Sequence, residues 1–339
     1  MKSHLPPGMN LFPLLFFLCL SPLALVILFA VLLNTPYQGG EGGGHIVEVP
    51  EGASARRVIA LLQGEGIIRY SLPARLYLAL SMEENRIHSG EYKFEMPVTT
   101  ARVIRQLLDG KVFLRQVTFP EGARGEEIIA TLVEAGIGER QSLREAFRDP
   151  GLIRDLGPGA VDLEGFLFPD TYRFSRSAPP EEIFGAMVRR FREVWDRVVQ
   201  LECVAGEIDP LAAVTMASLI EKETGREEER AIISGVFHNR LRRGMLLQCD
   251  PTVIYGLLRE GSYTGRLTRA DLISSTPYNT YTNRGLPPGP IANPGERSIQ
   301  AALCPGDSDY IYFVSMNTGR HHFSRTLVEH QAAVRRYQQ

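Results

Sequence analysis

The sequence predicts an α+β protein with a single N-terminal transmembrane helix, a small α/β module and a larger mixed α+β domain built round a buried helix. Three observations predict this class: an uncharged run over Leu11–Leu33, a strand-turn-helix unit that occurs twice, and an almost wholly apolar segment within Asp209–Gly225. With 339 residues, of which 44% are hydrophobic and 22% are charged, the chain is long enough for two globular domains.

Composition argues against several classes of function. A net charge of −2 at pH 7 gives no reason to expect nucleic acid as a partner. The chain has no CxxC or HExxH motif, and its cysteines, Cys19, Cys203, Cys249 and Cys304, lack metal-type spacing. We therefore expect neither a metal site nor a dense disulfide framework. The serine-hydrolase motif GxSxG is also absent.

The N-terminal run, Leu11–Leu33, has 23 residues without a charge, and about 20 apolar residues span the hydrocarbon core of a bilayer. A cleaved signal peptide is the alternative, but no small-x-small cleavage site follows the run. Lys2 precedes the run and Glu41 is the first charge after it, which favours a cytoplasmic N-terminus. We therefore predict a single-pass protein of the cell (inner) membrane with the bulk of the chain extracytoplasmic. The predicted segments are a short cytoplasmic tail (1–10), the transmembrane helix (11–33) and a glycine-rich tether (34–44).

The repeated unit begins at Val47–Gly52 and again at Val117–Gly122, an offset of 70, and the match continues to Gly66 and Gly136. In each copy the pattern predicts a half-buried strand, a Pro-Glu-Gly turn and a helix. The first copy resembles a LysM-type module, a small fold associated with glycans that contain N-acetylglucosamine, so we assign residues 45–115 to such a module. A plain α+β packing module is equally compatible, and glycan binding by this part stays open.

The segment Asp209–Gly225 carries the start and stop signals of a helix. Asp209 can cap the first turn, the following proline suits the first helical position, and Gly225 suits a left-handed stop. The apolar circumference predicts burial, yet the helix ends with Glu221 and Glu223. Either both are solvated at a helix end, or each has a partner or a raised pKa. At about 100° per residue the two side chains point roughly 200° apart, so only one can face a given cleft, and periodicity does not choose between them.

Other segments surround this helix in the sequence. Residues 163–172 are rich in aromatic rings, which form either core or a platform for sugars. The loop 275–283 is long and rich in hydrogen-bonding side chains, which is typical of a functional loop. The remaining expected elements are helices over 181–200, 226–242 and 250–256, a strand over 245–249, and a hairpin over 310–323 followed by a helix to Tyr337.

Together these motifs resemble the endolytic murein (peptidoglycan) transglycosylase family, which is also called MltG or YceG-like. The similarity runs in register over residues 45–335. It is carried by LEGFLFPDTY (163–172), ASLIEKET (217–224), VFHNRL (236–241), MLLQCDPTVIYG (245–256), PYNTY (277–281) and GLPPGPI (285–291). The family commonly has Thr where Cys249 stands. On this resemblance, residues 116–339 form the catalytic YceG-like domain.

The resemblance implies a membrane-anchored lyase, a peptidoglycan lytic transglycosylase, with Glu221 as its catalytic residue. Its substrate would be the nascent glycan strand, cut between N-acetylmuramic acid (MurNAc) and N-acetylglucosamine (GlcNAc), which would terminate elongation. The C6 hydroxyl of MurNAc attacks its own C1 and gives a 1,6-anhydro end, so one glutamate can donate a proton and then accept one. No metal or organic cofactor is required. Peptidoglycan synthases at the membrane are a further expected partner.

Sugar recognition needs planar rings and amide-type groups around the acid. We expect the following side chains to approach Glu221: Tyr172, Gln248, Asp250, Tyr255, Asn279 and Tyr281. Two alternatives stay open. A hydrolytic muramidase would need a second carboxylate, with Glu223 or Asp250 as candidates, and a non-catalytic glycan-binding scaffold would tolerate the loss of Glu221. If instead Glu221 is the sole acid and base of a transglycosylase, we expect Glu223 to be structural and to pair with a basic group such as one of the arginines of the following helix.

Overall fold

The computed structural model describes residues 11–39, 44–82, 86–201, 203 and 208–338, with side chains from residue 22 onward. The chain divides into two compact units, one of Met1–Leu114 with Ser175–Ser177 and one of Arg115–Phe174 with Ala178–Gln339. Helices and short antiparallel strand pairs occur in both, so the α+β class is confirmed. The predicted cytoplasmic tail (1–10) and residues 40–43 of the predicted tether lie outside the described residues.

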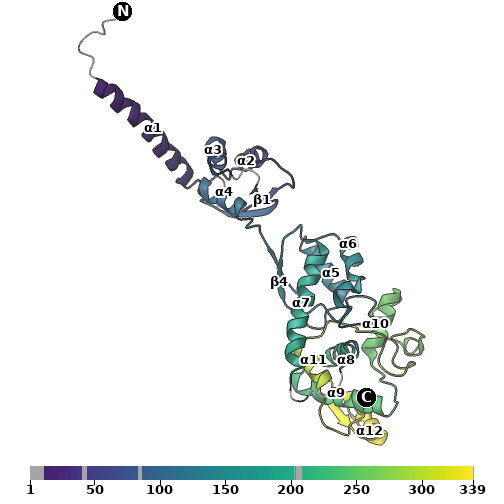
Figure 1. The fold of residues 1–339 in the computed structure, drawn as a ribbon. Coiled ribbons are helices and arrows are strands. Elements are labelled where there is room, and N and C mark those ends of the chain that lie inside the picture. Colours follow the sequence, from purple (N-terminus) through teal and green to yellow (C-terminus); the bar gives the residue numbers. More distant parts are fainter. Residues whose placement is uncertain (1–10, 40–43, 83–85, 202, 204–207, 339) are drawn as a thin grey trace, which may run out of the picture. The chain divides into compact units, whose positions relative to one another are not determined.

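The first unit has the order strand, helix, helix, strand, helix after its N-terminal helix (Figure 1). Its elements are α1 (Leu11–Asn34), β1 (Gly44–Val49), α2 (Ala55–Gly64), α3 (Ser71–Ser81), β2 (Gly90–Glu95) and α4 (Thr100–Leu108). β1 and β2 pair antiparallel, with Val47 opposite Tyr92. A lone two-stranded sheet is marginal in water. Residues of α2, such as Val58 and Leu62, are buried with the inward residues of the strands in one core.

The prediction of a transmembrane helix over Leu11–Leu33, and with it the single-pass membrane localisation, is wrong. Within the part of the chain that the structure describes, no helix is both long enough and apolar enough to cross a bilayer. A crossing takes about 20 apolar residues, and the side chains of α1 are described only from Pro22 to its end. At that end Leu33 is buried, and α1 contacts α3 and α4 of its own unit.

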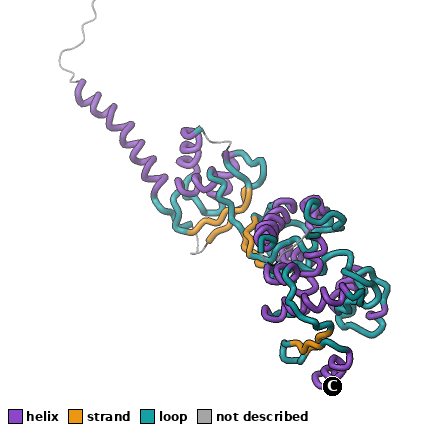
Figure 2. The backbone as a smooth tube through the Cα atoms, turned by 60° about the horizontal axis from the view of Figure 1, so that its bottom comes forward, coloured by secondary structure: helices purple, strands orange, loops and turns teal. Residues whose placement is uncertain are grey.

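The second unit is mostly helical, with two short antiparallel strand pairs, β3 with β4 and β5 with β6 (Figure 2). Its elements are β3 (Arg115–Thr118), α5 (Gly125–Glu134), α6 (Arg140–Phe147), η2 (Pro150–Ile153), β4 (Thr171–Phe174), α7 (Pro180–Val198), α8 (Pro210–Glu223), α9 (Glu227–Arg242), α10 (Asp250–Glu260), η3 (Asp271–Ile273), α11 (Glu296–Leu303), β5 (Tyr312–Ser315), β6 (His321–Ser324) and α12 (Leu327–Tyr337). The helices expected over 181–200 and 226–242, and the C-terminal hairpin and helix, are therefore confirmed.

The internal duplication is visible in the backbone. Each copy is a strand, a turn and a helix, and one copy lies in each unit: β1 with α2, and β3 with α5. The turn glycines Gly52 and Gly122 have φ of 68° and 75°, and the glycines after the helices, Gly66 and Gly136, have 68° and 72°. Only glycine adopts these left-handed conformations without strain, which explains why the repeat places it there. The LysM resemblance of the first copy stays a prediction.

Helix α8 is the centre of the second unit, as predicted. It packs against α9, α10 and α11 (Figure 1), and its residues from Val214 to Ile220 are buried. Asp209 caps it by accepting a hydrogen bond from the backbone N–H of Ala212 at 3.1 Å. The predicted left-handed stop is wrong, because the helix ends at Glu223 and the next residue, Thr224, is already extended.

Two further expectations need correction. Residues 245–249 are not a strand, because Gln248 has a φ of 52°, which breaks extended backbone. The helix that begins at Asp250 continues past the predicted end to Glu260 and stops at Gly261, whose φ is 70°. One disulfide, Cys203 to Cys304, ties the segment after α7 to the end of α11, while Cys249 is a free and buried thiol.

Candidate active site

A pocket of about 340 Å³ lies beside Glu223, the last residue of α8. Its walls come from α8 and α9, from the segment before α10, from the 275–283 loop and from the C-terminal strands and helix. The lining residues are Glu223, Arg240, Leu247, Gln248, Asp250, Tyr281, Phe313, Val314, Ser315, His321, His330, Val334 and Gln338. Carboxyl, amide, phenol and guanidinium groups thus converge on one concave surface, as they do in small-molecule sites.

The surroundings of Glu223 favour its protonated form. Its pKa is raised above the usual range, mainly because burial disfavours the charged form, and the charge of Asp250 raises it further. A hydrogen bond from the Cys249 thiol and the charges of His321 and Arg240 act in the opposite direction. Burial and the neighbouring Glu223 raise the pKa of Cys249 as well, so the thiol keeps its proton. The net effect holds Glu223 toward its protonated form, which a general acid requires.

Asp250 and Tyr281 form a second polar group in this pocket. The Tyr281 hydroxyl donates a hydrogen bond of 2.5 Å to Oδ1 of Asp250. Burial and this hydrogen bond raise the pKa of Tyr281 above its usual range, so the hydroxyl stays protonated. Asp250 arrives on the first turn of α10 and Tyr281 on the 275–283 loop.

Hydrogen bonds fasten that loop to the segment before α10. The backbone N–H of Gln248 donates to the Thr280 carbonyl at 3.1 Å, and the N–H of Cys249 donates to Thr280 Oγ1 at 3.0 Å. The hydroxyls of Thr252 and Thr280 are 2.9 Å apart. These contacts hold Gln248 in a left-handed conformation that costs a non-glycine residue on the order of 1 kcal/mol or more. Its position in the pocket is thus determined by the loop.

Asn279 is fully buried and acts behind the pocket rather than in it. Its Nδ2 donates to the carbonyls of Ser274 at 2.7 Å and Leu272 at 3.1 Å, and its Oδ1 accepts from the backbone N–H of Tyr281 at 2.9 Å. One amide therefore closes the loop on itself and orients Tyr281. The sequence predicts that Asn279 approaches Glu221, whereas the structure gives it a supporting position within the 275–283 loop.

Arg240 was not predicted. Its buried guanidinium donates to the carbonyls of Ile311 at 2.7 Å and Leu247 at 2.8 Å, and to Oε1 of Gln248 at 3.4 Å. Burial lowers the pKa of this arginine from its high usual value. Arg240 joins α9 to the strand β5 and places a cation at the pocket wall. The only sequence signal was its place within the VFHNRL motif.

Glu221 lies in different surroundings. Its Oε1 accepts a hydrogen bond from Nη2 of Arg230 at 3.3 Å, and its Oε2 accepts from the backbone N–H of Gly295 at 3.0 Å. Both side chains of this ion pair are more than nine-tenths buried. The arginine of the following helix, which we expected beside Glu223, therefore pairs with Glu221. The catalytic assignment of Glu221 stays a prediction.

Two of the expected substrate residues lie elsewhere. Tyr172 is in β4, at the other end of the unit from α12 (Figure 1), and its hydroxyl donates to the Phe168 carbonyl at 2.7 Å. Tyr255 is buried in α10, and its hydroxyl donates to Oε2 of Glu164 at 3.1 Å on the wall of a different pocket. The structure thus gathers Gln248, Asp250 and Tyr281, and it gathers them round Glu223.

Comparison with known proteins gives consistent matches. The profile described as the YceG-like family matches residues 47–336. An endolytic murein transglycosylase of Bacillus subtilis (strain 168) is 32% identical over 307 residues, which cover 86% of this chain and 84% of that protein. One from Streptococcus pneumoniae serotype 2 is 28% identical over 321 residues, which cover 85% of this chain and 57% of that longer protein.

A solved structure agrees with these matches. A crystal structure of a yceG-like protein from Listeria monocytogenes has a TM-score of 0.56 and 30% sequence identity, and the match covers 86% of this chain and 99% of that one. The family profile extends over most of the chain, including the segments that build both units. The chain therefore belongs to the YceG-like family.

Proposed function

We propose that the chain is an endolytic murein transglycosylase and that Glu223 is its catalytic acid and base. The family and the names of its curated relatives make it a lytic transglycosylase, a lyase that acts on peptidoglycan. The observation that carries the assignment of Glu223 is a partly buried carboxyl group with a raised pKa on the wall of a polar pocket. The sequence resemblance implied Glu221 as the catalytic residue, whereas this proposal assigns that role to Glu223.

The proposed reaction cleaves the MurNAc-GlcNAc bond within a nascent strand. Protonated Glu223 donates its proton to the glycosidic oxygen as the bond from that oxygen to C1 of MurNAc breaks. The C6 hydroxyl of the same MurNAc attacks C1, and the Glu223 carboxylate accepts the hydroxyl proton. The products are a free GlcNAc hydroxyl and a 1,6-anhydro-MurNAc end, no water is consumed, and Glu223 is protonated again. Attack within one sugar supplies a high effective concentration of the nucleophile.

We propose that Gln248, Asp250 and Tyr281 bind the sugar next to the scissile bond. All three line the pocket that Glu223 lines. The Asp250 carboxylate retains lone pairs for a sugar hydroxyl beyond the bond from Tyr281, and the Gln248 amide offers both donor and acceptor atoms. A hydrogen-bonded phenol beside an amide suits a neutral, hydroxyl-rich ligand.

In this proposal Glu221 is structural. Both of its oxygens already accept hydrogen bonds, one from a guanidinium and one from a backbone N–H. Breaking a buried ion pair leaves an unpaired charge, so Glu221 stabilises the junction of α8 with α9 and with the start of α11. Because Glu221 and Glu223 are two residues apart, the last turn of α8 supplies both a structural carboxylate and a catalytic acid in this proposal.

A second candidate, a hydrolytic muramidase, is favoured by one observation. Asp250 is close enough to Glu223 for its charge to raise the pKa of Glu223, so two carboxyl groups share the pocket. A glycosidase would use Glu223 as the acid and Asp250 as the base or nucleophile. The two reactions differ in their products, because hydrolysis leaves a reducing MurNAc end and transglycosylation leaves a 1,6-anhydro end.

We also propose a cellular role and a role for the first unit. Cutting nascent strands would terminate glycan elongation beside the peptidoglycan synthases. In a reaction that contains a synthase, the active enzyme is therefore expected to shorten the strands that the synthase makes.

For the first unit we propose a LysM-like contact with glycan. A groove of about 430 Å³ at the turn of the first copy supports it, lined by Val49, Pro50, Gly52, Ala53, Ser54, Ala55, Arg56, Ile87 and Ser89.

The test of the main proposal is digestion of uncrosslinked glycan strands followed by mass analysis of the ends. A transglycosylase gives 1,6-anhydro-MurNAc ends. Reducing ends would support the muramidase, and intact strands together with strand binding would support a non-catalytic scaffold.

A further inference from the structure

A histidine and a glutamate form a largely buried pair at the wall of the Glu223 pocket. His321, the first residue of β6, lines this pocket together with Glu223. Its Nδ1 lies 2.7 Å from Oε2 of Glu229 on α9, and its backbone N–H donates to Oε1 of the same carboxylate at 2.9 Å. The side chains of His321 and Glu229 are only 13% and 8% exposed. Neither residue has a role in the proposed reaction.

The contacts of this pair fix the imidazole ring. The Thr224 hydroxyl donates to Oε2 of Glu229 at 3.2 Å, and the His321 ring meets the ring of Phe313 edge to face, with centroids 5.4 Å apart. Burial raises the pKa of Glu229, but the hydrogen bonds from His321 outweigh burial and leave that pKa below its usual range. Glu229 is therefore a carboxylate near neutral pH. A carboxylate beside Nδ1 keeps the proton of a neutral imidazole on Nδ1.

The other ring nitrogen of His321, Nε2, has no hydrogen-bond partner among the described residues. With the ring proton on Nδ1, Nε2 carries a lone pair and can accept a hydrogen bond from a ligand in the pocket. A carboxylate that orients an imidazole in this way produces a general base in the serine hydrolases. His321 is also close enough to Glu223 for its charge to oppose the effect of burial on the pKa of Glu223.

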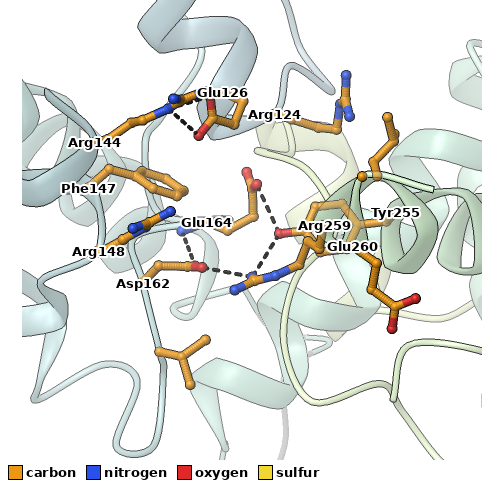
Figure 3. A pocket seen from close by; sticks show the side chains of 13 residues that line it. Arg124, Glu126, Arg144, Phe147, Arg148, Asp162, Glu164, Tyr255, Arg259 and Glu260 are labelled. Atoms are coloured by element: carbon orange, nitrogen blue, oxygen red, sulfur yellow. Dashed lines mark hydrogen bonds and ion pairs between the residues drawn. The ribbon is translucent and has the colours of Figure 1, made fainter. Parts of the chain in front are cut away.

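The larger pocket of the second unit, of about 640 Å³, is built differently (Figure 3). Its buried carboxyl group, Glu164, accepts hydrogen bonds from the backbone N–H of Gly125 at 3.0 Å and from the Tyr255 hydroxyl at 3.1 Å. Arg259 donates to Oδ2 of Asp162 at 2.8 Å and to the Tyr255 hydroxyl at 3.3 Å, which extends the network drawn in Figure 3. None of the described residues that line this pocket is a histidine. An imidazole held by a carboxylate thus distinguishes the pocket at Glu223.

The proposed reaction needs a base before Glu223 can serve as one. Glu223 is protonated when it begins to donate to the glycosidic oxygen, so it offers no carboxylate to the C6 hydroxyl until its own proton has left. A neutral imidazole on the same pocket wall is able to accept a proton from the start.

We propose that His321, oriented by Glu229, is a second catalytic residue that carries the proton of the MurNAc C6 hydroxyl to Glu223. This rests on the proposed function and adds one carrier to it. Nε2 accepts the proton as the bond from O6 to C1 forms, while Glu223 protonates the glycosidic oxygen that leaves C1. The imidazolium, paired with Glu229, then gives its proton to the Glu223 carboxylate. Both groups return to their starting forms, and no further reactant is consumed.

The pH profile of cleavage should show the carrier as an acid limb. Glu223 acts in its protonated form, so on its own it gives only a basic limb. Protonation of Nε2 in acid blocks the acceptor, so activity should fall on that side as well. The titratable and charged groups round the His321 ring are Glu229 and Arg240 on α9, Glu223 on α8, and Asp250, Tyr281 and His330 on the other walls of the pocket.

The test compares His321→Gln with His322→Gln and the parent enzyme. His322 is the next residue in β6, is exposed and does not line the pocket, so it is a matched control. The measurements are kcat and KM on uncrosslinked glycan strands across the pH range, together with the melting temperature. Glu229→Gln is a second variant, which keeps the imidazole and removes the carboxylate that fixes its proton.

His321→Gln is expected to lower kcat about 10² to 10³-fold with little change in KM, and to lose the acid limb while the basic limb remains. Glu229→Gln is expected to lower kcat in the same direction, and it decides the matter if His321→Gln does not fold. His322→Gln should behave like the parent enzyme. A pair that is only structural would lower the melting temperature and leave kcat and the acid limb unchanged, and that result would overturn the proposal.

Nuclear magnetic resonance of the full-length protein with isotope-labelled histidine separates this proposal from the proposed function. The His321 ring, identified by comparison with His321→Gln, should be the Nδ1–H tautomer, and a GlcNAc-MurNAc tetrasaccharide should shift its Nε2 resonance. A shifted Nε2 in a parent enzyme that forms no 1,6-anhydro ends would contradict the proposed function and support the contact of His321 with the sugar. An unchanged Nε2 in a parent enzyme that forms such ends would overturn the role of His321 and leave the proposed function in place.

Discussion

Glu221 and Glu223 are two residues apart at the end of α8, yet their carboxyl groups have different partners. Glu221 accepts hydrogen bonds from Arg230 and from the N–H of Gly295, whereas Glu223 accepts one from the Cys249 thiol and has a raised pKa. A rotation of roughly 200° between the two positions separates them. One carboxyl group holds the helix end to Arg230 and Gly295, and the other lines a polar pocket.

The first prediction concerns the pH profile of Asp250→Asn. The charge of Asp250 raises the pKa of Glu223, so its removal lowers that pKa. Because the protonated form donates the proton, activity is lost as the pH rises through the pKa, and the basic limb of kcat/KM moves to lower pH in the variant. The measurement is kcat/KM against pH, with the exposed Asp196→Asn as control. A basic limb that moves upward or stays in place would show that Asp250 does not act on the acid.

The same variant separates the two candidate reactions. A transglycosylase needs no second carboxylate, so Asp250→Asn retains measurable cleavage and still yields 1,6-anhydro ends. A muramidase that uses Asp250 as base or nucleophile loses cleavage almost completely. Mass analysis of the strand ends, for the parent and for the variant, distinguishes these outcomes.

Substitutions at Cys249 should move the pH profile in a predictable direction. The thiol hydrogen bond favours charged Glu223, so Cys249→Ala raises the pKa of Glu223 and moves the basic limb to higher pH. A hydroxyl is a stronger donor than a thiol, so Cys249→Thr moves the limb to lower pH. Identical profiles for the parent, Ala and Thr proteins would contradict the contact.

Stability should depend on pH through Glu164. Its pKa is raised from the ordinary value to about 8 by burial, so the folded state binds more protons than the unfolded state between those limits. The associated stability is complete below the unfolded pKa and is lost as the pH rises through the folded pKa, with a slope of up to about 1.4 kcal/mol per pH unit. Glu164→Gln cannot titrate and should remove this slope. Urea unfolding of both proteins across this range measures it, and parallel curves would contradict the prediction.

The sequence was most informative where structure is local. The Asp209 cap, the burial of α8 and the duplicated turn glycines Gly52 and Gly122 depend on neighbouring residues, and the structure has them as predicted. The prediction that α8 ends in a left-handed conformation at Gly225 was wrong. Thr224, one residue before Gly225, already has an extended backbone, and its N–H donates to the carbonyl of Ile220.

The site was less predictable because it depends on long-range contacts. Tyr255 and Asp250 lie on the same short helix, but they reach different pockets. Asn279 has a side chain that could bind a sugar, yet its amide N–H groups already donate to the loop carbonyls of Leu272 and Ser274. Arg240 carried no signal of its own, because its role comes from carbonyls of distant residues such as Ile311. Only the folded chain shows which of these groups is free for a substrate.

The most direct test compares Glu223→Gln with Glu221→Gln on uncrosslinked glycan strands, with cleavage and melting temperature measured for both. The account predicts that Glu223→Gln cleaves about 10² to 10⁴ times more slowly than the parent enzyme, because the amide cannot deliver a proton. The variant is expected to stay folded. Glu221→Gln should keep cleaving but lose about 1–3 kcal/mol of stability, because Arg230 loses its ionised partner. A stable but inactive Glu221→Gln together with an active Glu223→Gln would contradict the assignment of Glu223.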